Sequence, residues 1–399
     1  MMASAGRYSK VLIIVENLPV PFDRRVWQEA TTLVQAGYEV SIICPVGKGY
    51  EKRHEVIDGI YIYRHPLPLE ASGAFGYFLE YGWALFWEFS LALRIMFTRG
   101  FDVIHACNPP DMIFLLGLFF KLMGKKFIFD HHDINPELYE AKFGKRDGFY
   151  KLLTLLERLT FKTANVTIST NDSYRQIAIE RGSVKPNRVF VVRSGPNLER
   201  LKLMAPVKKW KQGRTFLIGY VGVMGKQEGI DYLLRAAQYI IGTLQREDVH
   251  FCLVGGGTSL NEMRQYAASL GLANHVTFTG RVPDQVLLEV LNTADVCVNP
   301  DIANTMNDKS TMNKIMEYMA IGKPIVQFDL TEGRFSAQEA SLYAKRNDHI
   351  DMAQKIVHLL DHPQLRQKMG EYGRARVVNE LEWQYEAPKL LAAYQALES

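Results

Sequence analysis

The 399-residue sequence lacks the features of a secreted, metal-binding or membrane-spanning protein. Its four cysteines all lie in or beside apolar runs and show no close metal-ligand spacing, which indicates buried thiols in a reducing compartment. The first apolar run, about six residues long before charges follow, is too short for a signal peptide. There is no short repeat and no low-complexity tract. We therefore expect a cytoplasmic protein with no disulfide framework and no metal site.

Strong charge and a long apolar run are also missing. The formal net charge is only +4, and no clustered basic face is evident, so nucleic acid is not an expected partner. In the most apolar segment, residues 74–97, Glu80, Glu88 and Arg94 keep the uninterrupted apolar run well below the roughly 20 residues of a membrane span. This segment predicts a long helix packed on a sheet. The alternative is a helix lying partly in a membrane surface, and the two interpretations can apply to different faces.

Short apolar, β-branched runs alternate with amphipathic segments along almost the whole chain. Runs without polar alternation indicate strands buried on both faces, as in a parallel sheet covered by helices. We expect strands at 10–16, 39–45, 60–65, 102–107, 126–132, 165–170, 189–195, 216–222, 250–256, 276–280, 296–300 and 324–329. Residues 196–214 resemble a linker, and 349–397 are helical in pattern. The sequence thus predicts an α/β protein with two doubly wound, Rossmann-like domains, 1–200 and 206–381, facing a central cleft.

Ligands of such folds bind beyond the carboxyl ends of the strands. In the second half, Gly222 and Gly225 flank a turn that carries Lys226 just before a helix. Glycines let backbone N–H groups approach an anion, and a helix N-terminus and a lysine add positive charge, so this turn suits a diphosphate. A tight strand-to-helix turn also needs glycine without any ligand. The loop from Gly280 to Val282 could hold a nucleobase through its backbone.

The segment from 308 to 329 predicts a helix between a polar loop and a buried strand. Ser310 or Thr311 is expected to cap this helix, which begins near Met312. Lys314 and Glu317 are three residues apart and so lie on one side. Glu317 could accept two hydrogen bonds from ribose hydroxyls, although a carboxylate near a helix start is favourable without any function. The buried face is expected to consist of Ile315, Met316 and Met319.

Asp130, His131, His132 and Asp133 cluster at the end of the predicted strand 126–132. Such spacing invites a metal site, but adjacent side chains of an extended chain point to opposite faces. The two histidines are therefore not expected to share an ion. We favour a single histidine that projects into the cleft and is oriented by a carboxylate. A plain hydrogen-bonded histidine is the alternative.

Taken in order along the chain, several segments resemble family 4 glycosyltransferases, the retaining group with the GT-B fold. They include FDHHDINPEL, HFCLVGGG, VTFTGRVPDQVLLEVLNTADVCVNP and IMEYMAIGKPIV. The resemblance covers nearly the whole chain. It implies an acceptor domain at 1–200, joined by a C-terminal helix at about 382–399, and a nucleotide-sugar domain at 206–381. The donor is then a UDP- or GDP-sugar, bound as a substrate without a metal cofactor.

The resemblance also assigns roles to residues. His132, with Asp133, matches the histidine that faces the donor sugar, and Glu317 matches the glutamate that binds the donor ribose. Arg281 and Val282 match the loop against the base. The backbone that meets the diphosphate and sugar matches Ser310, Thr311, Met312 and Asn313.

Some positions depart from the family pattern. Lys309 stands where the family has its first glutamate, eight residues before Glu317, and Asp308 is out of register. This departure keeps a second hypothesis open, a catalytically inactive partner that binds nucleotide-sugar or glycan for another transferase. A nucleotide-sugar epimerase is a further alternative, but it needs acidic groups at the anomeric centre. A nicotinamide-dependent dehydrogenase is disfavoured because neither half has G-x-G-x-x-G after its first strand.

At the diphosphate, the family's Arg and Lys are replaced by Val223 and Glu228. We therefore expect Lys226, together with Lys314, to neutralise the phosphates. The family's glycine-rich loop after the first strand is also absent. Its place is taken by residues 16–25, whose Arg24 and Arg25 could serve an anionic ligand or form surface salt bridges.

The implied reaction moves a sugar to a glycan or lipid-linked acceptor in cell-surface polysaccharide biosynthesis. The aromatic segment 74–97 and the basic N-terminal residues favour an acceptor held at a membrane surface, such as a polyprenyl-diphosphate-linked glycan. We accordingly expect a cytoplasmic protein with possible peripheral contact to the inner membrane surface.

Overall fold

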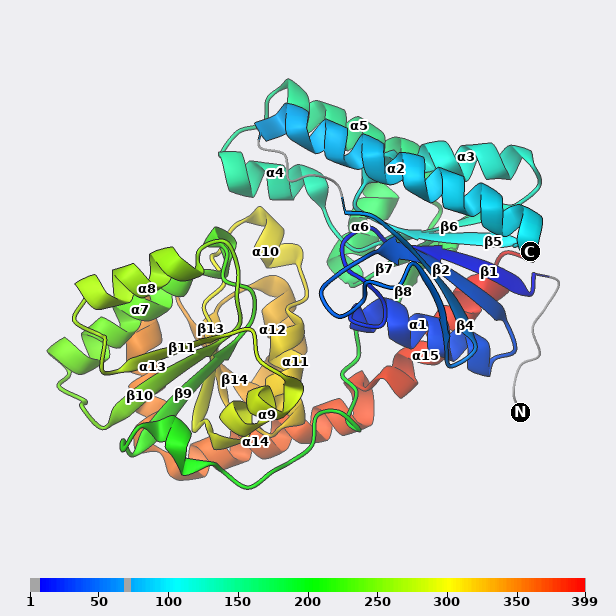
Figure 1. The fold of residues 1–399 in the computed structure, drawn as a ribbon. Helices are drawn as coiled ribbons and strands as arrows, with labels where there is room; N and C mark the ends of the chain where they lie inside the picture. The colour runs from blue at the N-terminus through cyan, green and yellow to red at the C-terminus, as the bar shows by residue number, and fades with distance from the viewer. Residues whose placement is uncertain (1–7, 68–72, 399) are drawn as a thin grey trace. The chain divides into compact units, whose positions relative to one another are not determined.

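The structure, a computed structural model, describes residues 8–67 and 73–398. The chain forms two compact units (Figure 1). Unit 1 runs to Ser194 and takes up the chain again from Gln384, and unit 2 spans Gly195–Trp383. The domain ranges expected from the sequence begin at residue 1 and end at 399. Residues 1–7 and 399 lie outside the described part.

Unit 1 is built on an eight-stranded sheet in the order β3-β4-β2-β1-β5-β6-β7-β8. The chain winds outward on both sides of β1, which is the doubly wound arrangement predicted from the sequence. Most strands other than the exposed edge strand β3 are buried and apolar because helices cover both faces of the sheet. The strands are β1 (Lys10–Ile14), β2 (Glu39–Pro45), β3 (His54–Ile57), β4 (Ile60–His65), β5 (Val103–Cys107), β6 (Lys126–His131), β7 (Val166–Ser169) and β8 (Val189–Val191).

Figure 1 shows α2 and α3 over one face of this sheet and α1 and α15 over the other. Helix α15 belongs to unit 1, although the chain reaches it only after unit 2. The helices of unit 1 are α1 (Arg24–Gln35), α2 (Gly73–Thr98), α3 (Phe114–Leu122), α4 (Asn135–Phe143), α5 (Gly148–Thr163), α6 (Asp172–Glu180) and α15 (Trp383–Gln395), with short 3₁₀ turns η1 (Asp111–Ile113) and η2 (Pro186–Arg188).

Two strands of unit 1 differ from the expectation. The unpredicted strand β3 pairs antiparallel with β4 through a two-residue turn, Asp58-Gly59, in which both residues have positive φ. This sequence favours a hairpin, so the sheet is not wholly parallel as expected. The strand predicted at 189–195 ends at Val191. Beyond it, the N–H of Arg193 donates to Glu386 of α15 at 2.9 Å.

Unit 2 contains a six-stranded sheet in the order β11-β10-β9-β12-β13-β14, in which all neighbours are parallel. The edge strand β14 was not predicted because it is only partly buried and so lacks a continuous apolar run. The strands are β9 (Phe216–Val221), β10 (Val249–Val254), β11 (Val276–Gly280), β12 (Val296–Asn299), β13 (Ile325–Phe328) and β14 (Ser341–Ala344).

Two apolar clusters cover the faces of this second sheet. One is formed with α7, α8 and α13, and the other with α9 and α11. The helices are α7 (Ile230–Gln238), α8 (Leu260–Ser269), α9 (Asp284–Thr293), α10 (Thr305–Lys309), α11 (Asn313–Ala320), α12 (Thr331–Ala337), α13 (His349–Asp361) and α14 (Pro363–Arg376). Shorter turns are η3 (Lys208–Lys211), η4 (Lys226–Glu228), η5 (Tyr239–Thr243), η6 (Gln338–Ala340) and η7 (Val377–Leu381). The four cysteines are buried and unpaired, as expected.

The aromatic segment 74–97 is helical, as predicted, within α2. In the described part of the chain, none of the helices combines the length and the apolar character needed to cross a membrane. The side chain of Glu80 lies outside the described residues, whereas Glu88 is buried. Phe89 of α2 packs on Phe119 of α3, with ring centroids 4.9 Å apart. The exposed residues beside this contact, here called the α2–α3 apolar face, are Trp83, Phe86, Phe97, Leu115, Leu118, Phe119, Leu122 and Met123.

Candidate functional site

His132 directly follows β6 at the carboxyl end of the unit 1 sheet. Its Nε2 lies 2.6 Å from Oδ2 of Asp130 and 2.9 Å from Nε of Arg25. Arg25 Nε–H points at the same nitrogen, which would need a lone pair there, but it also lies 3.3 Å from Oδ2 of Asp130 and can donate to it instead. We therefore assign the proton to Nε2, because the other tautomer would bring two lone pairs together at 2.6 Å. A neutral His132 then carries its lone pair on Nδ1. The ring therefore offers a hydrogen-bond acceptor on the side turned away from Asp130.

Asp130 is the buried anion of this region. Arg25 Nη2 lies 3.0 Å from its Oδ1, and His105 Nε2 lies 3.3 Å from its Oδ2. Burial opposes ionisation, but Arg25 and His132 hold the pKa of the Asp130 carboxyl well below its usual range. Arg25, expected at an anionic ligand or at the surface, instead forms a buried ion pair. Arg24 is exposed.

Burial strongly raises the pKa of the neighbouring carboxyl group, Glu29. It lies on α1 one turn after Arg25, and its Oε1 is 3.1 Å from Arg25 Nη2. Burial raises the pKa of Glu29 well above its ordinary value, and the charge of Asp130 adds to this, although Arg25 opposes the shift. Burial thus disfavours the charged form of Glu29. Arg25 and Asp130 balance each other's charge beside His132.

Asn108, which follows β5, holds the backbone of His132 and Asp133. Its Oδ1 accepts from the N–H of His132 at 2.8 Å and from that of Asp133 at 3.1 Å. Its Nδ2 donates to the carbonyl of Asp133 at 2.7 Å and to Oδ1 of Asp111 at 2.8 Å. All the hydrogen-bonding capacity of this buried amide is used. Sequence reasoning did not identify Asn108, although a polar residue at a strand end was a usable signal.

Asp133 is partly buried, and burial raises the pKa of its carboxyl. A side-chain hydrogen bond from Asn17, in the loop after β1, opposes this shift together with the nearby histidines. The carboxylate that bonds to the His132 ring is Asp130. The expected pairing of one histidine with a carboxylate is thus present, while Asp133 meets Asn108 through its backbone.

His131 points to the opposite face of the sheet from Asp130. Its Nε2 lies 3.4 Å from Oε1 of Glu157 on α5, and its ring stands against Phe161 with centroids 5.0 Å apart. Arg181 also pairs with Glu157. The two adjacent histidines therefore lie in separate environments, as the alternation of an extended strand predicts.

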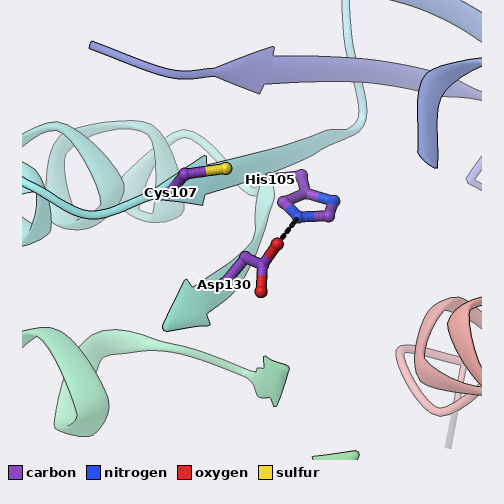
Figure 2. Close-up of side chains that lie close together, drawn as sticks. All are labelled: His105, Cys107 and Asp130. Carbon is purple, nitrogen blue, oxygen red and sulfur yellow. Dashed lines mark hydrogen bonds and ion pairs between the residues drawn. The ribbon is translucent and has the colours of Figure 1, made fainter. Parts of the chain in front are cut away.

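Potential metal ligands occur together in unit 1. Figure 2 shows His105 and Cys107 from β5 beside Asp130 from β6, with the bond from His105 to Asp130 drawn. Their ligand atoms all lie within 4.8 Å of one another. Burial raises the pKa of the Cys107 thiol well above its ordinary value, which keeps it protonated, and Asp130 already holds Arg25. A metal would have to displace the guanidinium, so this donor set does not fit a resident ion. The same holds for the second group, Glu29, Asp130 and His132.

In unit 2, Gly222 and Lys314 come together beyond the end of β9. A Cβ at position 222 would lie 2.6 Å from Oη of Tyr220 and 3.3 Å from Cε of Lys314, so only glycine fits. Lys314 Nζ pairs with Oδ1 of the buried Asp301 at 2.8 Å. Burial opposes this charge, but Asp301 raises the pKa of Lys314 above its ordinary value. The strand end therefore carries a fixed, partly shielded cation.

Lys226 lies in a different setting. It is exposed in η4, and it lines a depression of about 850 Å³ with residues of α7 and α8, among them Arg235 and Tyr266. Nothing from the 310–317 segment lines this depression. Lys314, rather than Lys226, is the lysine that meets Gly222.

The N-cap residue of α11 is Met312. It makes no side-chain capping bond, so neither Ser310 nor Thr311 occupies the expected N-cap position. Ser310 instead ends α10, where its Oγ donates to the carbonyl of Met306 at 2.8 Å. The first N–H groups of a helix have no partner one turn earlier within it, so those of α11, which starts at Asn313, point ahead of the helix. The predicted apolar face of Ile315, Met316 and Met319 is buried.

Glu317 is held by an arginine that sequence reasoning missed. Arg200 Nη2 bonds to Oε1 of Glu317, and its Nη1 lies 3.4 Å from Oδ2 of Asp284. Asn197 fixes the segment, because its Oδ1 accepts from the N–H of Arg200 at 3.2 Å. Glu317 and Lys314, predicted on one helix side, thus have different partners. An arginine in an apparent linker gives no signal of such a bond.

Asp308 does not take the place of the missing glutamate. Its carboxylate accepts from the N–H and Oγ1 of Thr331, both at 3.0 Å, and pairs with Arg346 at 2.8 Å. These bonds direct it to the start of α12. Lys309 is the last residue of α10 and is partly exposed.

Arg281 and Val282 occupy the loop between β11 and α9. The side chain of Arg281 lies against Gly256, where an added Cβ would be 3.3 Å from Arg281 Cγ. Val282 packs on the apolar cluster that includes Leu287 and Leu288. The structure thus brings the β11 loop against the glycines that follow β10.

Two family models match the chain. Glycosyltransferase Family 4 matches residues 23–200, and Glycosyl transferases group 1 matches residues 215–362. The two ranges do not overlap and together take up most of the sequence. An uncharacterized glycosyltransferase of Methanocaldococcus jannaschii is 24% identical over 320 residues, which is 74% of this chain and 73% of the other.

Solved structures are similar along the whole chain. Sucrose-phosphate synthase from Thermosynechococcus elongatus superposes with a TM-score of 0.79 at 19% identity, covering 98% of this chain and 99% of that one. Anabaena HepE in complex with UDP-glucose gives a TM-score of 0.74 at 14% identity, covering 97% and 99%.

Proposed function

Because the chain belongs to the family 4, group 1 glycosyltransferases and has their GT-B fold, we propose that it transfers a sugar from a nucleoside-diphosphate sugar. The donor is a UDP- or GDP-sugar. The acceptor is a hydroxyl of a glycan or of a lipid-linked glycan, in the synthesis of a cell-surface polysaccharide. The similarity to a protein that binds UDP-glucose supports the class of donor.

The donor site that we propose lies in unit 2, at the start of α11. The first N–H groups of this helix and the charge of Lys314 suit a diphosphate, while Glu317 accepts bonds from the ribose. Ser310, Thr311, Met312 and Asn313 form the loop and helix start that meet the phosphates and sugar. The loop of Arg281 and Val282 holds the base. Gly222 leaves room for the phosphates against Lys314, and Lys226 has a lesser part because it faces α7 and α8.

The chemistry follows from charge that develops on the leaving diphosphate. As the bond from the anomeric carbon to the phosphate oxygen breaks, negative charge grows on that oxygen. Backbone N–H groups and a lysine already in place stabilise it without reorganisation, which lowers the barrier. The sugar then passes to the acceptor oxygen with retention, and the acceptor proton leaves with the phosphate. No resident metal is needed for this step in the proposal.

His132 is the group of unit 1 proposed to act toward the transferred sugar. Because its Nε2–H donates a hydrogen bond to Asp130, its Nδ1 is proposed to accept a hydrogen bond from a sugar hydroxyl. Asp133 is proposed to assist from the same strand end. The buried pair of Arg25 and Asp130 fixes the ring and therefore its tautomer.

The observation that carries this proposal is the start of α11 beside Lys314 and Glu317, in a chain of this family. The test is incubation of the purified protein with UDP- and GDP-sugars and a membrane glycolipid extract. Release of one nucleoside diphosphate together with an α-linked product from an α-linked donor, read by NMR, supports retaining transfer. An inverted product contradicts the proposed mechanism.

A second candidate is an inactive partner that binds nucleotide-sugar or glycan. It is favoured by Lys309 at the position of the family's first glutamate, and by the bond that Arg200 makes to Glu317. In the same assay this candidate predicts donor binding without any release of diphosphate.

The α2–α3 apolar face supports the proposed contact with the cytoplasmic surface of a membrane. It presents Phe97 and Leu122, which are 81% and 82% exposed, next to the exposed Arg94. Aromatic and basic side chains of this kind suit an anionic interface. In flotation with anionic liposomes we expect the wild type to bind and the double variant Phe97→Ser, Leu122→Ser to stay behind. Equal binding by both proteins would contradict the proposed membrane contact of the α2–α3 apolar face. The control is Phe335→Ser in unit 2, which should bind as the wild type does.

A further inference from the structure

Arg200 lies in the segment 196–214, which resembles a linker in sequence but is built into unit 2. The segment follows directly after the chain leaves unit 1. Asn197 begins a tight turn, because its Oδ1 accepts from the N–H of Glu199 at 2.8 Å and from that of Arg200 at 3.2 Å. On the other side of Arg200, Leu201 is 1% exposed within an apolar cluster. The backbone at Arg200 is therefore held from both sides.

The same segment runs along α9. Asn292 of this helix donates from Nδ2 to the carbonyl of Lys202 at 3.1 Å and accepts at Oδ1 from the N–H of Met204 at 2.9 Å. Leu201 shares its apolar cluster with residues of α9 and α11. Arg200 thus extends from a stretch of backbone that packs on both of these helices.

The guanidinium of Arg200 joins two parts of the proposed donor site. Its Nη2 bonds to Oε1 of Glu317 on α11, and its Nη1 lies 3.4 Å from Oδ2 of Asp284. Asp284 is the first residue of α9 and comes two residues after Val282, in the loop proposed to hold the base. The side chains of Arg200 and Glu317 are 20% and 15% exposed, so their ion pair is only partly shielded from solvent. One arginine therefore connects the residue proposed for the ribose with the helix that follows the base loop.

The bond to Arg200 is compatible with ribose binding by Glu317. A carboxylate offers about four acceptor positions on its two oxygens, so one bond from a guanidinium does not exclude two more from ribose hydroxyls. A glutamate side chain that is already held by a fixed partner loses less rotamer freedom when the ligand binds. Preorganisation of this kind strengthens the bonds that depend on Glu317 and leaves the contacts of the phosphates unchanged.

We propose that Arg200 is a positioning residue of the donor site, which orients Glu317 and thereby gives the protein a preference for ribonucleotides over deoxyribonucleotides. This inference rests on the proposed function, because it assigns a specificity to the same donor site. Arg200 acts through Glu317 and not by contact with the donor. Its loss should therefore weaken the bonds to the ribose hydroxyls and spare the contacts of the diphosphate with the start of α11.

The test is calorimetric titration of the full-length protein with uridine and guanosine diphosphates, and with the 2′,3′-dideoxy analogue of the one that binds. We expect the wild type to bind the ribonucleotide at least about tenfold more tightly than the analogue, since a hydrogen bond to a charged group contributes this much. Arg200→Met, which keeps an unbranched stem without the charge, should weaken ribonucleotide binding several-fold and leave binding of the analogue unchanged. Arg200→Lys, which keeps the charge, should show an intermediate preference.

The matched control is Arg246→Met. Arg246 pairs with Asp248 and Asp361, and its side chain is 22% exposed, close to the 20% of Arg200. It lies just before β10, whereas the donor site is proposed at the carboxyl ends of the strands. This variant should lose stability but keep the wild-type preference for the ribonucleotide. Thermal unfolding of each variant shows whether it is folded.

Three results would overturn the proposal while the wild type still binds a nucleotide and the proposed function stands. They are equal binding of ribonucleotide and analogue by the wild type, an unchanged preference in folded Arg200→Met, and tighter ribonucleotide binding by that variant. The last would mean that Arg200 competes with the donor for Glu317. If Arg200→Met does not fold, a wild-type preference in Arg200→Lys would overturn the proposal instead. If neither diphosphate binds to the wild type, the proposed donor site is contradicted together with the role of Arg200.

Discussion

At the scale of residues, His132 is held at two points by side chains that are distant in the sequence. Asn108 bonds to its backbone, and Asp130, locked by Arg25, bonds to its ring. The first fixes where the residue stands, and the second fixes its tautomer. A group that must meet a substrate hydroxyl within a few tenths of an ångström needs both constraints.

Replacement of Asn108 by Ala should impair transfer without affecting donor binding. The change leaves two N–H groups and one carbonyl of the 132–133 backbone unmet, so we expect a loss of about 2–4 kcal/mol in the free energy of unfolding. The kcat for transfer should fall roughly 10²-fold, since a misplaced His132 affects the reaction step. Calorimetric donor titration and initial rates measure the two effects.

The matched control is Asn165→Ala, which removes a similar bond from Asn165 to the N–H of Phe127 at the other end of the sheet. It should lose stability but keep kcat per folded molecule. An equal loss of kcat in both variants would mean that Asn108 acts only through stability.

The buried Glu88 predicts a pH dependence of stability. Its pKa in the folded protein is about 8, above its ordinary value of 4.5, because burial disfavours the charged form. The contribution of protonated Glu88 to the free energy of unfolding is therefore fully present below pH 4.5, and it is lost as the pH rises through about 8. Glu88→Gln removes the titrating group. The free energy of unfolding of the variant should therefore rise relative to that of the wild type as the pH rises, by at most on the order of 4 kcal/mol.

Urea unfolding at pH 5, 7 and 9 measures this difference. The exposed Glu339→Gln is the control for loss of one carboxylate, and it should show a flat difference. A flat difference for Glu88→Gln as well would contradict a raised pKa.

At the scale of elements, the apolar runs located most strands of both sheets, because a strand buried on both faces has no other pattern. They missed β3 and β14, which lie at sheet edges and are only partly buried, so neither has a continuous apolar run. The start of α11 was near the expected position, but its N-cap is Met312, and the Oγ of Ser310 donates back to α10. The partners of Arg25, Asn108 and Arg200 escaped prediction because they lie 105, 24 and 117 residues away.

Helix α15 is the element whose contribution to the site is least evident from the sequence. Tyr394 on this helix donates to Nδ1 of His105 at 2.8 Å, and His105 in turn donates to Asp130. Through this bond, the last helix is connected to Asp130, the group that orients His132. Only the folded sheet brings these residues together.

Tyr394→Phe should therefore leave the His105 ring nitrogen unpaired and lower the free energy of unfolding by about 1–3 kcal/mol. We expect a several-fold lower kcat, with the donor KM unchanged. Thermal unfolding and initial rates give the two values. Tyr385→Phe, on the same helix but exposed, is the control and should change neither. A shifted donor KM with unchanged kcat would exclude the proposed path through Asp130.

At the scale of the whole molecule, the proposed roles divide between the units. The groups suited to an anionic nucleotide lie in unit 2, and His132 with its buried carboxylate Asp130 and the α2–α3 apolar face lie in unit 1. The net charge of +4 gives no sign of this division, because the charges that matter are paired inside each unit. The order of motifs along the chain predicted the family, while the partners of Lys314 and Glu317 required the structure.

The measurement that tests the central claim most directly is thermal stabilisation by a panel of nucleoside diphosphates and nucleotide-sugars. It compares the wild type, Glu317→Ala and the exposed-site control Glu339→Gln. We predict a clear rise in Tm with either uridine or guanosine diphosphates, retained in Glu339→Gln and lost in Glu317→Ala. If no nucleotide raises the Tm of the wild type, or if Glu317→Ala responds as the wild type does, the donor site proposed at α11 is contradicted.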